Sequence, residues 1–219
     1  MNYEEFRKNT RNLLSLIDEK TEFLGFKVTS DREVISGALF DICLDHAKGV
    51  VVTLENKLHA SSYALIRPLF ESFVRAAWIQ HCACDSEISY VKKKDKFKLS
   101  FEEMLKAVEK ERQWEKTLSQ VKQSAWKAMN SYTHGGIQLV GRRLNENFIE
   151  HNEDEEELIG ILQFVCIISF LTLSEMFGMS TGFDKENEFL ANLLDDLCKW
   201  CFIPGVTKQD VSVVEEGHK

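Results

Sequence analysis

The chain has 219 residues, of which 44% are hydrophobic and 28% are charged, and its formal net charge is −8. This length and composition are typical of a soluble globular protein with one domain and a sizeable core. The acidic balance argues against a basic nucleic-acid-binding domain, because phosphate contact needs a positive face. Only two prolines occur and long apolar-periodic segments fill most of the chain, so we expect an all-α fold.

The first residues, MNYEEFRKNT, include acids and lack the apolar stretch of a signal peptide. We therefore expect a cytoplasmic protein whose six cysteines are reduced thiols. The pattern predicts a single helical bundle domain over residues 1–204, with about seven to eight helices, and a flexible tail over residues 205–219.

Two helices are expected in the first quarter of the chain. The first covers Tyr3 to Leu24. Ser30 and Glu33 form a capping box that opens the second, which runs from Asp31 to Asn56. His46 lies on the apolar side of this second helix. Such a histidine is either a neutral core residue, which we favour, or part of a binding site.

The stretch Leu58–Cys84 is expected to form the central helix of the fold. It reads as one long helix that is apolar nearly all round, which is typical of a buried helix. Arg67, Glu71 and Arg75 are spaced four apart, so they lie on one stripe of it. Because unpaired buried charge is very costly, these side chains must pair or face a cavity.

Pro68 falls inside this central helix, next to Arg67. A proline cannot donate the hydrogen bond to the Ala64 carbonyl and crowds that turn, so we expect a kink. The kink is either a simple bend around the core or the opening of a pocket beside the charged stripe.

The segment after the central helix is more polar. Asp85 can cap a short helix that ends near Lys94, and the basic run Lys92–Lys98 is interpreted as a solvated turn. Ser100 and Glu103 form a second capping box, which opens a helix through Glu111.

A further helix is predicted from Trp114 to Tyr132, and it ends in the sequence SYTHGG. Gly135 and Gly136 suit a left-handed helix stop, so His134 lies at the last turn, where the helix dipole favours a cation. The candidate binding residues are His46, Tyr132, Arg142 and Arg143, the last two in the following loop.

The acidic run Glu153–Glu157 begins the next helix, whose Leu158–Met179 part is long and apolar enough to span a bilayer. Polar residues such as Gln163 and Glu175, and the lack of a flanking basic or aromatic belt, favour the most buried helix of a soluble bundle and no membrane contact. A last helix is predicted over Asp184–Phe202.

The cysteine pairs do not indicate a metal site. Cys82 with Cys84 and Cys198 with Cys201 lie in or at the ends of apolar helices, whereas a zinc site needs four ligands that converge from turns. HExxH, EF-hand, P-loop and GxSxG patterns do not occur, so we expect no metal and no cofactor.

Arg75 and His81 are separated by five residues on the central helix. This spacing resembles the signature of the HEPN superfamily, whose members are small all-helical proteins. The resemblance implies a metal-independent ribonuclease of toxin–antitoxin or phage-defence systems, with His as general acid or base and Arg stabilising phosphate charge. On an ideal helix, however, the two side chains point about 120° apart.

A second resemblance covers more of the chain. The sequence SSYALIRPLFESFVRAAW and the later MNSYTHGG are similar to an uncharacterised bacterial all-helical family, some of whose members occur near defence genes. That family carries an ALxRPxFE helix and a YTHxG turn, and the resemblance implies a possibly HEPN-like fold. The matching residues are Arg67, Pro68, Phe70, Glu71, Tyr132, Thr133, His134 and Gly136. It leads us to expect His134 beside a paired Arg67 and Glu71.

Two functions remain open. The favoured one is an interaction or structural module, a homodimer or the partner of another protein, in which Arg67–Glu71–Arg75 is a buried network. The alternative is a ribonuclease acting on RNA, with Arg75 and His81, or Arg67 and His134, at the site. The candidate catalytic residues are Arg67, Glu71, Arg75, His81 and His134.

Overall fold

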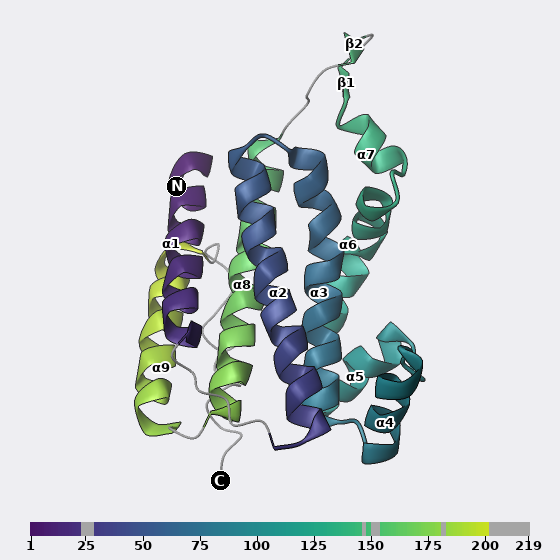
Figure 1. Ribbon diagram of the computed structural model, residues 1–219. Coiled ribbons are helices and arrows are strands. Elements are labelled where there is room, and N and C mark those ends of the chain that lie inside the picture. Colours follow the sequence, from purple (N-terminus) through teal and green to yellow (C-terminus); the bar gives the residue numbers. More distant parts are fainter. Residues whose placement is uncertain (23–28, 146–147, 150–153, 181–182, 202–219) are drawn as a thin grey trace.

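The computed structural model describes residues 1–22, 29–145, 148–149, 154–180 and 183–201. These residues form the expected all-α multi-helix bundle, with nine helices and one very small hairpin among them (Figure 1). The elements are α1 Tyr3–Glu22, α2 Asp31–Glu55, α3 His59–His81, α4 Asp85–Lys94, α5 Phe101–Glu111, α6 Thr117–Thr133, α7 Ile137–Gly141, β1 Leu144–Asn145, β2 Phe148–Ile149, α8 Glu155–Met179 and α9 Phe183–Trp200.

Both predicted capping boxes are present. The Ser30 hydroxyl accepts from Glu33 N at 3.3 Å, and the Glu33 carboxylate accepts from Ser30 N at 3.1 Å. Ser100 and Glu103 make the same reciprocal pair at the start of α5. Each box satisfies backbone donors that the first helical turn leaves open, which fixes where α2 and α5 begin.

Helices α2 and α3 form an antiparallel hairpin at the centre of the bundle (Figure 1). They approach closely at Gly49, where an added Cβ would lie only 3.0 Å from Leu65 Cδ1. At the other end, Arg32 at the start of α2 donates to the Ile79 and Ala83 carbonyls, at 2.6 Å each. Arg32 therefore caps the C-terminus of α3 and fixes the register of the hairpin.

Helix α8 contacts α1, α2, α3 and α9, as expected of a core helix (Figure 1). It is also the one helix of the described residues that is long and apolar enough to cross a membrane, with half of its most apolar stretch buried inside the fold. Length and composition alone therefore fit both environments, and the packing is that of a bundle core.

Several predicted boundaries were wrong. Helix α6 begins at Thr117 and not at Trp114, because Gln113 and Lys116 adopt positive φ angles of 56° and 60°. Helix α3 ends at His81, and Cys84 rather than Asp85 occupies the N-cap of α4. The expected tail over 205–219 and the predicted helix ends at Leu24 and Phe202 lie outside the described residues, as does Glu153.

The segment after α6 is not the simple loop that we expected. It contains the short helix α7 and the hairpin β1–β2, in which Leu144 pairs with Ile149 and Asn145 with Phe148. This segment, called the arm below, extends beyond one end of the bundle (Figure 1). Five large apolar side chains are exposed along the arm: Ile137, Val140, Leu144, Phe148 and Ile149.

Candidate functional site

The charged stripe of α3 is a closed ion network. Arg67 Nε donates to Glu71 Oε1 at 2.7 Å, and Arg75 Nη2 lies 2.7 Å from Glu71 Oε2. The side chain of Glu71 is 14% exposed, against 24% for Arg67 and 36% for Arg75. Both oxygens of one mostly buried carboxylate are thus used by the arginines one turn before and one turn after it.

His134 reaches this network from the end of α6. Arg67 Nη1 and His134 Nε2 are 2.9 Å apart, although 67 positions separate the residues in the sequence. A guanidinium can only donate, so Nε2 of His134 is the acceptor in this contact. The structure therefore brings together Arg67, Glu71 and His134 as the sequence led us to expect.

The glycines after His134 hold it in place. Gly135 has a φ of +67°, a conformation that L side chains rarely adopt. At Gly136, an added Cβ would lie 2.5 Å from Ser131 Oγ and 3.0 Å from Ser131 Cα. Both glycines are thus needed for the turn that presents His134 to Arg67.

Helix α3 continues through Pro68 as one α-helix. The Ala64 carbonyl, which Pro68 cannot satisfy, is 3.5 Å from the Thr133 hydroxyl. The same hydroxyl donates more closely to the Met129 carbonyl, at 2.9 Å. The carbonyl freed by the proline thus faces α6, directly before His134, and not an open pocket.

Aromatic rings cover both arginines of the stripe. The Arg67 guanidinium lies 4.9 Å from the ring centre of Trp126, which stacks on Phe101 at 4.7 Å. Arg75 lies 5.3 Å from the Phe97 ring. Such cation–π contacts add to the ion pairs, although Arg75 Nε remains buried without a hydrogen-bond partner among the described residues.

Tyr132 belongs to a neighbouring cluster one α3 turn away. Its hydroxyl donates to Glu157 Oε1 at 2.8 Å and accepts from Arg142 Nη2 at 2.9 Å, while Arg142 also pairs with Glu157. Tyr63 packs against Tyr132 at 4.8 Å between ring centres. Burial and the Glu157 carboxylate raise the pKa of both tyrosines, so they stay neutral hydrogen-bonding groups. This cluster ties α3, α6, α7 and α8 together.

His81 belongs to a different cluster, away from Arg75. Its Nε2 lies 2.5 Å from Oε2 of Glu175, a carboxylate on α8 that is only 4% exposed. Arg112 Nε lies 3.2 Å from the other oxygen, close enough for an ion pair but not aligned for a hydrogen bond. Arg75 and His81 therefore contact different carboxylates, Glu71 and Glu175, and no contact joins Arg75 to His81.

The remaining candidates are His46 and Arg143. His46 is half-buried on α2, and burial lowers the pKa of its imidazole, as expected of a neutral packing histidine. Arg143 is the second residue after α7 and is half-buried. Among the described residues, no group of three or more His, Cys, Asp or Glu side chains could hold a metal ion.

Sequence reasoning missed several partners in these clusters. Trp126 could have been found, because it lies eight residues before His134 and hence on the same face of α6. Glu157 and Glu175 carried no such signal, because their partners lie on other helices. The partners that were missed are Trp126, Glu157, Glu175 and Arg112.

Residues 40–189 of the chain match a family of unknown function (DUF6988). This range includes both the charged stripe of α3 and the turn with His134. Neither the curated proteins nor the solved structures contain a match to the chain.

Proposed function

We propose that the chain, which belongs to a family of unknown function (DUF6988), is a non-catalytic helical interaction module. In this proposal the module acts in the cytoplasm, in a bacterial defence or toxin–antitoxin type system. That setting rests on the resemblance of the ALIRPLFE helix and the YTHGG turn to a family with members near defence genes.

The proposal rests on the observation that the charged groups of the stripe and the imidazole of His134 are already bonded to one another. Both Glu71 oxygens pair with arginines, and the Nε2 lone pair of His134 accepts from Arg67. A general base must offer that lone pair to a substrate proton. The arrangement instead suits a partly buried network that fixes α6 against α3.

We propose that a second copy of the chain is the partner and that the arm is the surface through which it binds. Phe148 is 70% exposed and Ile149 87% exposed. A lone two-stranded hairpin is only marginally stable in water, and its open edge is a template for pairing. The same strand from a second copy supplies a matching antiparallel edge about a two-fold axis.

Light scattering on a sizing column tests the dimer. The wild type should elute as a dimer, and the double variant Phe148→Ser and Ile149→Ser should elute as a monomer with an unchanged helical signal. A control pair of serines at Val34 and Val52, which are exposed on α2, should leave the dimer intact. A wild type that stays monomeric at high concentration would exclude the arm as a homodimer surface.

One observation favours the second candidate function, a metal-independent HEPN-type ribonuclease that uses Arg67 and His134. The 2.9 Å contact already pairs a phosphate-stabilising cation with a histidine. The pairing of Arg75 with His81 is not favoured, because His81 Nε2 is held by the buried Glu175.

Expression in cells decides between the two functions. The wild type is expressed beside His134→Ala and His81→Ala, and growth and the integrity of total RNA are compared. The module predicts intact RNA in all three cultures, with lower soluble yield for the variants. Degraded RNA and slow growth with the wild type, relieved by His134→Ala while His81→Ala stays toxic, would establish the ribonuclease instead.

A further inference from the structure

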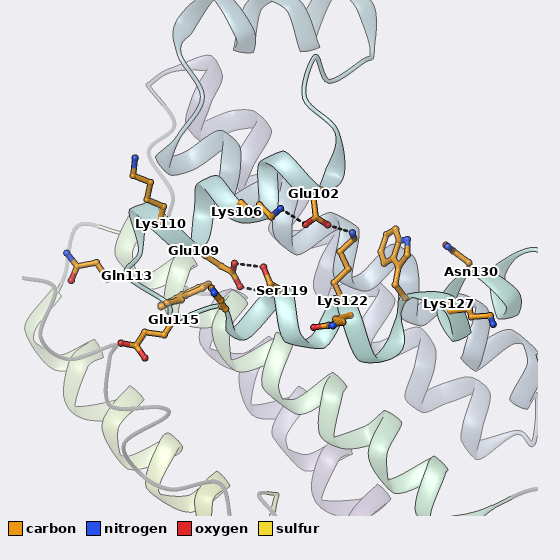
Figure 2. Close-up of a pocket in the computed structure, with 14 residues that line it drawn as sticks. Glu102, Lys106, Glu109, Lys110, Gln113, Glu115, Ser119, Lys122, Lys127 and Asn130 are labelled. Carbon is orange, nitrogen blue, oxygen red and sulfur yellow. Dashed lines mark hydrogen bonds and ion pairs between the residues drawn. The ribbon is translucent and has the colours of Figure 1, made fainter.

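A large open groove lies between α5 and α6 (Figure 2). Its volume is about 1080 Å³, slightly above the ~300–1,000 Å³ of small-molecule sites. The residues that line it are Glu102, Lys106, Glu109, Lys110, Gln113, Trp114, Glu115, Lys116, Ser119, Lys122, Gln123, Trp126, Lys127 and Asn130.

This groove is cationic although the chain as a whole has a net charge of −8. Five lysines line it against three glutamates. Three of the lysines are exposed and make no ion pair within the part of the chain that the structure describes. These are Lys110, Lys116 and Lys127.

Two of the three glutamates are already engaged. Glu102 pairs with both Lys106 and Lys122, which lowers the pKa of its carboxyl to about 2 (Figure 2). Glu109 is buried and accepts from the backbone N of Ser119 at 2.6 Å and from its hydroxyl. Glu109 thus occupies the positive end of α6, and a bound anion would have to lie along the exposed lysines instead.

The tryptophan rings of the groove are already in contact with other rings and with cations. Phe101 stacks against the Trp126 ring, and the cations of Arg67 and Lys122 lie over it at 4.9 and 5.5 Å. Trp114 is likewise stacked against Phe73, with Arg112 at 5.6 Å, and is buried. The groove therefore offers charge without the stacking platforms of most single-strand binding sites.

We propose that this groove binds an extended phosphate-bearing chain, either a single-stranded nucleic acid or a polyphosphate, through its exposed lysines. Lys110 and Lys127 lie toward opposite ends of the groove, so the cations follow its length (Figure 2). A chain of phosphates can contact all three lysines, which a single phosphate ion cannot. Because the tryptophan rings are already engaged, binding depends on charge and shows no base preference. The site is independent of the module function proposed above.

The test measures binding of a fluorescein-labelled single-stranded RNA of about 12 nucleotides, a length within the ~4–16 of known single-strand sites. Fluorescence anisotropy is recorded from about 50 to 200 mM salt for the full chain and for two triple variants. The groove variant is Lys110→Gln, Lys116→Gln and Lys127→Gln. The control is Lys93→Gln, Lys94→Gln and Lys96→Gln, which removes three exposed lysines of the other basic run.

The wild type should bind with a micromolar Kd at low salt. The groove variant should bind at least about tenfold more weakly, and its slope of log K against log salt should be shallower by about 2, which is ~0.7 for each of three lost phosphate contacts. The control variant should bind like the wild type. No binding at about 50 mM salt, or equal losses in both triple variants, would overturn the proposal.

Competition tests whether the charge of a phosphate chain is enough for binding. Unlabelled oligo-dT and a polyphosphate of equal charge should each displace the RNA as well as unlabelled RNA does, while inorganic phosphate should not. Displacement by RNA alone would contradict recognition by charge, because it would require contacts with bases or 2′-hydroxyls.

Discussion

Replacing Glu71 by alanine removes the anion that joins the two arginines of α3. Both carboxylate oxygens make 2.7 Å contacts, one with Arg67 and one with Arg75. Two guanidinium groups then lose their nearest counter-charge, on a helix whose other faces are packed in the core. The variant should fold into the same bundle with lower stability.

The size of the loss follows from the burial of the three side chains. Exposed ion pairs contribute ~0–1 kcal/mol, and breaking a fully buried pair costs ~3–5 kcal/mol. Glu71 is mostly buried, but Arg67 and Arg75 are 24% and 36% exposed, so water can solvate the freed cations. We therefore expect a loss of about 2 kcal/mol, which lowers the melting temperature of a chain of this size by about 4–8 °C.

Thermal melts followed by circular dichroism check this value. Glu71→Gln keeps the shape and one acceptor, so it should melt between Glu71→Ala and the wild type. Glu155→Ala, an exposed glutamate in the first turn of α8, should cost less than about 1 kcal/mol. If Glu71→Ala and Glu155→Ala melt alike, the stripe is a solvated surface and the reasoning fails.

Three further predictions concern Glu175, His46 and Arg32. Glu175→Ala should cost more than Glu71→Ala, about 3–5 kcal/mol in urea unfolding, because it strands His81 and Arg112 around a carboxylate that is only 4% exposed. Burial lowers the pKa of His46 in the folded state, so the unfolded state takes up the proton first. Stability should therefore fall as the pH drops below about 6.5, and His46→Gln should flatten this part of a profile of urea midpoint against pH. Arg32→Ala should cost about 1–3 kcal/mol and speed amide exchange in the last turn of α3 more than in its middle, which native-state hydrogen exchange measures.

Much of the fold could be predicted because local sequence patterns indicate where its helices begin and how far they extend. The two Ser–Glu capping boxes set the starts of α2 and α5, and apolar periodicity separated the long helices. The arm was missed because two-residue strands carry no alternation that a pattern could reveal. The start of α6 was misplaced because Lys116 adopts a left-handed conformation without being Gly or Asn.

The candidate site was predictable only in part. Spacing alone placed Arg67, Glu71 and Arg75 on one stripe, and helix geometry already separated Arg75 from His81. The approach of His134 came from the two motifs of the family resemblance and not from any local rule. The carboxylate that holds His81 is 94 positions away on α8, and no local pattern indicates such a pairing.

The most direct test of the proposed structural network is a double-mutant cycle between Arg67 and His134. Urea unfolding is measured for the wild type, Arg67→Ala, His134→Ala and the double variant. If the contact is structural, the two changes are not additive, with a coupling free energy within the ~0.5–3 kcal/mol usual for touching residues, and purified RNA stays intact with all four proteins. Additive losses, together with RNA cleavage that either substitution abolishes, would contradict the structural role and make the pair a catalytic one.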